Sequence, residues 1–286
     1  MICCVIPFCG ADFKQAVELL NWIQELGGCP NHRCLLVVDA AVPWKSALSV
    51  LKLAEKAFRF TRIIATDKPL EGAWPEPQNE MFLFTAAYVK EPFLWLEPDT
   101  EPLAVGWLDT IDAEYRAAGK PFMGKVYRFD RPQSPYAPMD VLSGIAVYPA
   151  DTIQRLGEAI RIRPKIAWDV STANLTVPCA HNTELLQWLW GEPNNPPKFA
   201  ENNIPNTATF CLKQLSPQAV LFHRNKDGSL IHLLRKRMFP DKYTNIFAHG
   251  GDVGDLIYGL PAMKTIGPGC LILHYHPVRE PFNEHK

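Results

Sequence analysis

The sequence predicts an α/β protein built on a doubly wound sheet. Short, fully apolar runs alternate with longer segments in which apolar residues recur at helical spacing, which is the pattern of strands alternating with covering helices. The chain has 286 residues, 47% hydrophobic and 21% charged, so it can bury a sizeable core. Its 26 prolines gather in the stretches 69–77, 132–138 and 193–205, which must be loops because proline donates no backbone hydrogen bond.

The first half of the chain shows the clearest alternation. Residues 2–6 form an apolar run that ends at Pro7 and Gly10, and helical spacing follows over residues 13–23. Residues 34–38 are fully apolar, as expected of a strand covered on both faces in a parallel sheet. Further along we expect, in order, a helix over 46–58, a strand over 62–65, a helix over 79–89, a strand over 93–96 and a helix over 107–117.

Beyond Gly119 the alternation is less regular, and we expect a mixed sheet in this half. The elements predicted here are strands over 122–127 and 143–148 and helices over 152–159 and 183–190.

The charge balance and the cysteines exclude several classes of protein. The 29 basic and 30 acidic side chains leave a formal net charge of −1, so no overall field draws the molecule to nucleic acid or to an anionic membrane. The sequence contains no apolar run of about 18 residues and no basic region before its first apolar stretch, so we expect a cytoplasmic protein without a membrane partner. The eight cysteines form no Cys-x-x-Cys pair and are expected to be reduced, mostly buried thiols.

Three carboxylates follow the predicted central strand at alternating positions, in the segment 97–101 (Glu-Pro-Asp-Thr-Glu). Ligands of doubly wound sheets bind at the carboxyl ends of the strands, where this turn lies. Two carboxylates two residues apart can place oxygens on one Mg²⁺ or Mn²⁺ ion beside a diphosphate. A solvated acidic turn is the alternative. The residues that follow the other strands are Pro7, Asp39, Asp67 and Lys68.

At this turn the chain resembles the A-type (GT-A) glycosyltransferases, nucleotide-sugar enzymes with one Rossmann-like domain and an Asp-x-Asp motif after the central strand. Glu97 and Asp99 match the two acids. Because Glu stands in the first position, the resemblance makes Asp99 the more secure metal ligand, on a turn that we expect to be exposed. It also implies a nucleoside diphosphate sugar donor, with a UDP-sugar as the first choice, and a Mn²⁺ or Mg²⁺ cofactor. The donor-binding candidates are Pro7, Asp39, Asp67 and Lys68.

A second fragment supports the same resemblance. Residues 220–230 read Val-Leu-Phe-His-Arg-Asn-Lys-Asp-Gly-Ser-Leu, similar to the C-terminal segment from which members of that family often add a histidine to the metal site. The resemblance implies that His223 binds the metal and that Lys226 binds the phosphates. The alternative is a structural histidine at the end of an apolar strand.

Two segments of the second half are candidates for an acceptor site. Ser143 and Gly144 lie in a segment that resembles the family's strand beside the acceptor, where glycine lets a sugar approach the backbone, and residues 134–142 would extend this wall. Trp168 offers an aromatic face, and Asp169 is a candidate general base for the acceptor hydroxyl. An ordinary strand and a solvated loop acid are the alternatives. Weaker candidates are His181 and Glu184.

The end of the chain shows the pattern expected at the start of another domain. A short apolar run from residue 246 enters a glycine-rich turn, and another apolar run follows over 270–275. This resembles the opening of the B-type, heptosyltransferase-like glycosyltransferases, with a glycine-rich structural turn as the alternative. The combination is reminiscent of phage-encoded glycosyltransferases, some of which modify hydroxylated bases in DNA. The basic residues that could meet DNA phosphates, or serve the donor diphosphate, are Arg224, Lys226, Arg235, Lys236, Arg237 and Lys242.

The function expected from these features is metal-dependent transfer of a sugar from a nucleoside diphosphate to an acceptor hydroxyl, in the host cytoplasm if a phage encodes the protein. We expect a GT-A-like domain over 1–240, with a nucleotide-binding half over 1–118 and an acceptor half over 119–240, and a partial B-type unit over 241–286. Two alternatives stay open. One is a nucleotidyltransferase, although residues 7–10 lack the basic loop of that class. The other is a non-catalytic module of the same fold that binds sugar or nucleic acid.

Overall fold

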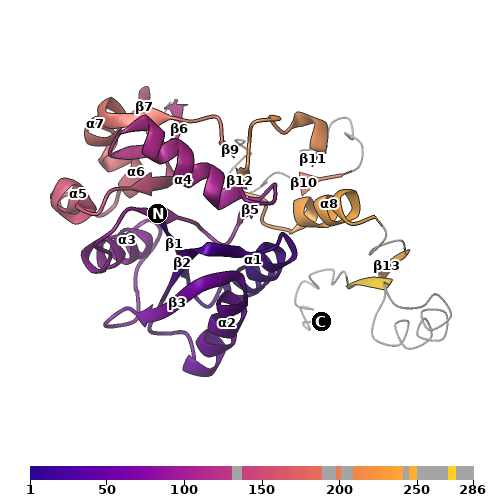
Figure 1. The fold of residues 1–286 in the computed structure, drawn as a ribbon. Helices are drawn as coiled ribbons and strands as arrows, with labels where there is room; N and C mark the ends of the chain where they lie inside the picture. Colours follow the sequence, from indigo (N-terminus) through magenta and orange to yellow (C-terminus); the bar gives the residue numbers. More distant parts are fainter. Residues whose placement is uncertain (131–136, 189–197, 201–208, 241–244, 250–269, 275–286) are drawn as a thin grey trace, which may run out of the picture. The chain divides into compact units, whose positions relative to one another are not determined.

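The largest described sheet has seven strands in the order β3-β2-β1-β4-β7-β6-β8, and β1, β2, β3, β6 and β7 are labelled in Figure 1. The computed structural model describes residues 1–130, 137–188, 198–200, 209–240, 245–249 and 270–274. The parallel strands are β1 (Cys3–Phe8), β2 (Cys29–Val38), β3 (Phe58–Ala65) and β4 (Phe93–Trp95). Strand β7 (Met139–Tyr148) runs antiparallel to β4 and to β6 (Phe122–Phe129), and β8 (Ala180–Asn182) pairs parallel with β6. The predicted doubly wound, mixed α/β sheet is confirmed.

Helices lie against this sheet along its whole length. Helices α1 (Phe13–Glu25) and α2 (Trp44–Ala57) contact each other and the strands β1, β2 and β3, and α4 (Trp107–Ala118) contacts β2 (Figure 1). Helix α3 (Glu76–Tyr88) contacts α5 (Thr152–Arg161). Two short helices, α6 (Trp168–Ser171) and α7 (Ala173–Thr176), pack on β7, and the 3-10 turns are η1 (Val177–Cys179) and η2 (Leu212–Gln214).

The central strands form where the sequence is apolar without interruption. All six residues of β1 and the last five of β2 are buried, as expected for parallel strands covered on both faces. Gly28 makes the tight entry into β2 possible, because its φ is +70° and a Cβ there would lie 2.7 Å from the carbonyl oxygen of Ala57. Local sequence and packing therefore agree in this half.

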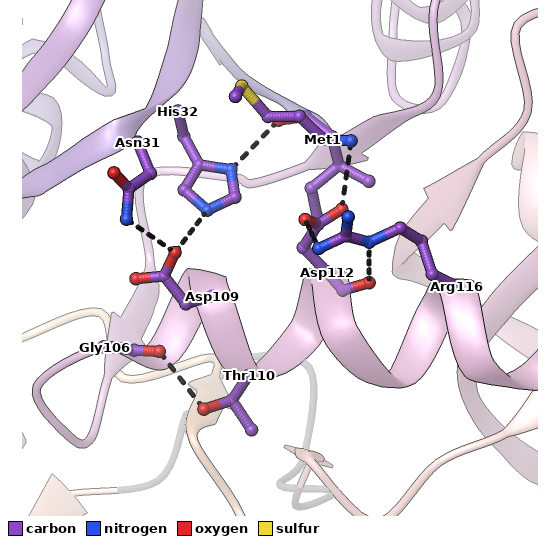
Figure 2. Close-up of polar contacts among 9 residues, drawn as sticks. Met1, Asn31, His32, Gly106, Asp109, Thr110, Asp112 and Arg116 are labelled. Atoms are coloured by element: carbon purple, nitrogen blue, oxygen red, sulfur yellow. Dashed lines mark hydrogen bonds and ion pairs between the residues drawn. The ribbon is translucent and has the colours of Figure 1, made fainter.

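Polar side chains connect helix α4 to the amino-terminal edge of the sheet (Figure 2). The ring of His32 lies between two acceptors, with Nδ1 3.2 Å from the carbonyl oxygen of Ile2 and Nε2 3.1 Å from Oδ1 of Asp109. One turn further along α4, the buried carboxylate of Asp112 lies 3.5 Å from the amino terminus of Met1 and pairs within the helix with Arg116 at 2.7 Å. These contacts lie at the opposite edge of the sheet from the strands' carboxyl ends.

A second sheet has the order β5-β12-β9 and brings distant segments to the acidic turn. Strand β5 (Thr100–Pro102) is antiparallel to β12 (Leu221–His223), and β12 is parallel to β9 (Leu186–Trp188). The helix predicted over 183–190 is therefore wrong in its described part. Backbone pairing of β9 with β12 takes the place of the local bonds of a helix, and such long-range pairing is not visible in residue spacing. A two-stranded sheet pairs β10 (Lys198–Phe199) with β11 (Thr209–Phe210).

The chain divides into two compact units, Met1–Leu230 and Ile231–Lys286. Helix α8 (Ser229–Met238) crosses the boundary. In the second unit β13 (Asn245–His249) pairs parallel with β14 (Cys270–His274), so strands expected near 246 and over 270–275 are confirmed. The glycine-rich turn between them lies outside the described residues, and the B-type interpretation and the boundary near 240 stay predictions.

The seven cysteines of the described side chains are free, and four of them, Cys3, Cys4, Cys29 and Cys34, are buried. Among the described residues no helix combines the length and the apolar character needed to cross a bilayer.

Candidate active site

A cavity of about 560 Å³ opens at the carboxyl ends of β1, β2 and β4 in the first unit. The strand order reverses between β1 and β4, which is where doubly wound sheets bind their ligands. The predicted site residues that line the cavity are Pro7, Asp39, Glu97, Asp99, Ser143, Gly144, Trp168, Asp169, His223 and Lys226. Asp67 and Lys68 are exposed and are not among its lining residues.

Three side chains converge at one point of this cavity. The ligand atoms of Glu97, Asp99 and His223 all lie within 4.8 Å of one another. The imidazole Nε2 of His223 is 3.3 Å from a carboxylate oxygen of each acid. Strand pairing produces this convergence, because β12 sets His223 opposite Thr100, the residue after Asp99. Residues more than a hundred positions apart in sequence thus form one cluster.

Asp99 is buried, with 7% of its surface exposed, so the expected exposed turn is wrong. The pairing of β5 with β12 covers the turn, and the backbone N–H of Arg224 donates to the Asp99 carbonyl at 2.9 Å. Burial alone would raise the pKa of Asp99, but the charge and hydrogen bond of His223 and the charge of Lys226 lower it to about 2. Asp99 therefore carries a negative charge at neutral pH.

The same contacts act on His223 in the opposite sense. Burial disfavours a charged imidazole, yet Asp99 and Glu97 raise the pKa of His223 to about 9. A proton on the ring thus serves as the counter-charge of the two carboxylates. The third acid of the turn, Glu101, is buried, and burial raises its pKa well above the usual range, which favours its neutral form.

The loop after β12 presents Lys226 to the cluster. The ammonium of Lys226 is 3.5 Å from Oδ2 of Asp99. The side chain of Gln15 donates to the Lys226 carbonyl at 3.1 Å, and the buried Asn225 side chain accepts from the Leu230 N–H at 3.0 Å. Arg224 adopts a positive φ of 86°, a strained conformation for this residue that recurs at functional sites. The loop is therefore held at both ends.

Glu97 is oriented by an aromatic neighbour that sequence reasoning missed. The indole N–H of Trp95 donates to Oε1 of Glu97 at 3.3 Å, while Oε2 faces His223. Trp95 is buried and packs edge-on against Phe82 and Trp168, with centroid distances of 5.2 and 5.7 Å. Its side chain cannot move without disturbing the core, so Glu97 is fixed toward the cluster.

Asp39 organises the loops that follow β2 and β3. Its Oδ1 accepts hydrogen bonds from the N–H groups of Ala41 at 3.0 Å and Leu70 at 3.2 Å. The hydroxyl of Thr66 ties the same loops together, accepting from the Ala40 N–H and donating to the Lys68 carbonyl, both at 2.9 Å. This end of the cavity also carries Trp74, a side chain with 67% of its surface exposed.

Asp169 lies at the other end of the cavity beside an aromatic pair. Its Oδ1 accepts from the Val170 N–H at 2.8 Å, and its Oδ2 is 3.4 Å from the Tyr127 hydroxyl. The rings of Tyr127 and Trp188 are in contact, with centroids 4.2 Å apart and planes tilted by 57°. Burial, reinforced by the negative charge of Glu97, raises the pKa of Asp169 to about 6. Such a carboxylate is ionised at pH 7 yet basic enough to take a proton.

Gly144 has a packing role that the sequence does not reveal. A Cβ at this position would lie 3.0 Å from Cζ2 of Trp168. Trp168 is buried, stacks on Phe82 at 5.0 Å, and donates its indole N–H to the Tyr148 hydroxyl at 3.3 Å. The glycine therefore makes room for the indole, and close approach of a sugar at Gly144 stays a prediction. Residues 134–136 of the expected acceptor wall lie outside the described residues.

The weaker candidates are engaged elsewhere. His181 faces Glu114, with Nε2 3.0 Å from Oε1, and Glu184 pairs with Lys125 at 2.6 Å. Neither is among the cavity's lining residues. Of the basic residues expected near phosphates, Arg224 and Lys226 belong to the first unit, whereas Arg235, Lys236 and Arg237 form the last turn of α8. Lys242 lies outside the described residues.

Three aromatic lining residues were not selected from the sequence: Tyr127, Trp188 and Trp74. Tyr127 is the last residue of a predicted strand, and β6 runs in the same direction as β4, so its place at a strand end was the available signal. The wrong helix over 183–190 concealed Trp188, which as a strand residue faces His223 in register. Trp74 has no distinguishing pattern, because an aromatic residue in a proline-rich loop is equally typical of a surface contact.

Comparisons with known proteins bear on the fold. No protein-family model matches the chain, and curated protein sequences give no significant match. The structure of the galactosyltransferase LgtC in complex with donor and acceptor sugar analogs matches with a TM-score of 0.51 and 10% identity, over 80% of this chain and 88% of that one. An active-site mutant of LgtC matches with a TM-score of 0.52 and 9% identity, over 82% and 96%. The protein therefore has the GT-A-like glycosyltransferase fold that the sequence predicted.

Proposed function

We propose that the protein is a metal-dependent glycosyltransferase that moves a sugar from a nucleoside diphosphate sugar, with UDP-sugars as the first choice, to an acceptor hydroxyl. The observation that carries the proposal is the convergence of Glu97, Asp99 and His223, with ligand atoms within 4.8 Å, in a cavity at the switch point of a GT-A-like fold. A cavity of about 560 Å³ is within the range of small-molecule sites.

The three side chains fit a divalent cation. Two carboxylates and one imidazole suit Mn²⁺ or Mg²⁺, and Asp99 is buried and ionised, so it offers a full negative charge to a cation. Glu97 is already oriented by Trp95. When bound, such an ion supplies positive charge that offsets the charge developing on a departing diphosphate.

The residues around this cluster have separate tasks in the proposed reaction. Lys226 places an ammonium beside Asp99, where it would bind the diphosphate oxygens. Pro7 and Asp39 line the nucleotide end, and Ser143, Gly144 and Trp168 line the acceptor end. Asp67 and Lys68 would contact a donor only if it extended beyond the lining residues of the cavity.

Asp169 is the proposed general base. An acceptor oxygen forms a bond to the anomeric carbon while the bond from that carbon to the diphosphate oxygen breaks, and the electron pair leaves with the diphosphate. The acceptor proton passes to the Asp169 carboxylate, whose raised pKa suits that step. Tyr127 keeps the carboxylate in place through its hydroxyl.

A donor screen tests the proposal. The full chain is incubated with UDP-, GDP- and CMP-sugars with Mn²⁺ or with chelator, and release of free nucleotide is measured. We expect hydrolysis of one class of donor that requires the metal and is lost in Asp99→Asn, with Glu55→Gln, an exposed carboxylate of α2 outside the cavity, as the control. Absence of hydrolysis and of nucleotide-sugar binding would instead favour the non-catalytic module, and release of pyrophosphate from a nucleoside triphosphate would favour the nucleotidyltransferase.

A further inference from the structure

One end of the cavity is a wall of aromatic rings with a single carboxylate. Trp188 pairs in register with His223, so the wall begins beside the proposed metal site. From Trp188 it continues through the contacting ring of Tyr127 to Asp169, whose Oδ2 is 3.4 Å from the Tyr127 hydroxyl. Glu97 also lines the cavity, and its negative charge acts on Asp169.

The carboxylate of Asp169 has no cationic partner among the described residues. Its two hydrogen-bond donors there are a backbone N–H and a phenol, which carry no charge. Lys226 is the one lysine or arginine among the described lining residues, and its ammonium is held at Asp99. The protonated ring of His223 is the counter-charge of Glu97 and Asp99. A second anion brought to the wall would therefore meet the negative charge of Asp169 with no lysine or arginine paired to it among the described residues.

Aromatic faces beside a carboxylate are suited to an uncharged sugar ring. The C–H groups of a pyranose pack on aromatic rings, and a carboxylate accepts hydrogen bonds from its hydroxyls. We propose that Tyr127, Trp188 and Asp169 form a subsite for an uncharged sugar ring, and that Asp169 excludes sugars that carry a carboxylate. This rests on the proposed function, because the subsite would hold the transferred sugar or the acceptor sugar beside the metal site.

The size of the discrimination follows from electrostatics. Two like charges a few ångströms apart near a protein surface repel strongly enough to weaken binding by about 10-fold or more. Replacing Asp169 with asparagine keeps the shape and one acceptor oxygen, exchanges the other oxygen for an NH2 donor, and removes the charge. The change should therefore reduce discrimination between neutral and acidic sugars, whereas removing an exposed carboxylate of helix α2 outside the cavity, in Glu55→Gln, should not.

The experiment compares a neutral with an acidic sugar in two arms on the full chain. In the first arm, methyl glucoside and glucuronate are titrated without nucleotide by saturation-transfer NMR. In the second, UDP-glucose and UDP-glucuronate are titrated calorimetrically with Mn²⁺. We expect the neutral ligand to bind about 10-fold tighter in at least one arm, and the ratio to fall to about 3-fold or less in Asp169→Asn but not in Glu55→Gln. The arm that shows the ratio identifies the acceptor or the donor sugar as the occupant.

Trp188→Leu provides a second measurement. It should weaken binding of the neutral and the acidic ligand by a similar factor and leave the ratio of their affinities unchanged. An unchanged ratio in Asp169→Asn, equal wild-type affinities in both arms, or absence of sugar binding in both arms would overturn the inference. A ratio for the free sugars with no binding of UDP-sugars would uphold the subsite and refute the proposed donor. Tight binding of both UDP-sugars, with no preference for the neutral sugar in either arm, would support the proposed donor and refute the subsite.

Discussion

Replacing the buried carboxylate of Asp99 by an amide should destabilise the metal-free protein. The pKa of Asp99 lies at about 2, against 3.8 for an ordinary aspartate, because His223 and Lys226 outweigh the effect of burial. This difference of about 2 pH units corresponds to ~2 to 3 kcal/mol in favour of the folded state. The raised pKa of His223 reflects the same interaction, so the stabilisation is counted once.

The sign of the pH dependence follows from the depressed pKa. The stabilisation is fully present above pH 3.8, where an unfolded aspartate is ionised, and is lost as the pH falls toward about 2. At pH 7 in chelator, urea unfolding of Asp99→Asn should therefore show ~2 kcal/mol less stability than wild type, whereas the control Asp67→Asn should stay within about 0.5 kcal/mol. The difference between the two variants should narrow near pH 3.

A second measurement on the same variants distinguishes loss of metal binding from loss of folding stability. A ligand that binds only the folded state stabilises it in proportion to the logarithm of its concentration. Saturating Mn²⁺ should raise the unfolding midpoint of wild type and of Asp67→Asn but not of Asp99→Asn. Equal stability of both variants in chelator, together with an unchanged response to Mn²⁺, would refute the reasoning that joins Asp99 to His223 and to the cation.

Three further predictions concern single positions. Gly144→Ala should destabilise the protein by ~1 to 3 kcal/mol, because the added Cβ would lie 3.0 Å from the buried Trp168. Gly10→Ala, whose added Cβ would have nothing within 4 Å, should be neutral in the same unfolding assay. Equal effects of the two substitutions on stability would contradict the packing role of Gly144. Because the pKa of Asp169 is raised to about 6, the stability of the protein should fall by at most ~3 kcal/mol as the pH rises from about 4 to about 6. Asp169→Asn should abolish this loss in unfolding curves measured over a series of pH values. A wild-type dependence of stability on pH in the variant would exclude Asp169 as the source of the loss. His223→Ala should weaken calorimetric binding of UDP with Mn²⁺ by about 10-fold or more, as for loss of a ligand, and leave binding in chelator unchanged; a loss of the same size in both conditions would return His223 to a structural role.

The parts of the fold that could be predicted are those in which local sequence and burial agree. The apolar runs that became β1, β2 and β4 are buried in the sheet, and their order determines where the carboxyl ends meet. Asp39 and Asp99 could therefore be selected as site residues from their place after a strand. For the same reason Asp67 and Lys68 were selected, although the loop after β3 leaves them exposed.

The parts that could not be predicted depend on contacts between distant segments. Strand β9 exists because it pairs with β12, and the burial of Asp99 follows from the pairing of β5 with that strand. The apolar spacing near Trp188 is compatible with a helix until that partner is known. Likewise, Gly144 is explained by Trp168, which lies 24 positions later in the sequence and fills the space beside it.

The central claim is that Glu97, Asp99 and His223 hold one divalent cation against a nucleotide diphosphate. Crystals of the full chain with UDP and Mn²⁺, measured at a wavelength where manganese scatters anomalously, test it most directly. We expect one anomalous peak within about 2.0 to 2.4 Å of ligand atoms from all three side chains, typical of O and N ligation, with diphosphate oxygens beside it and beside Lys226. Bound UDP without a peak at this cluster, or a manganese peak held by other residues, would contradict it.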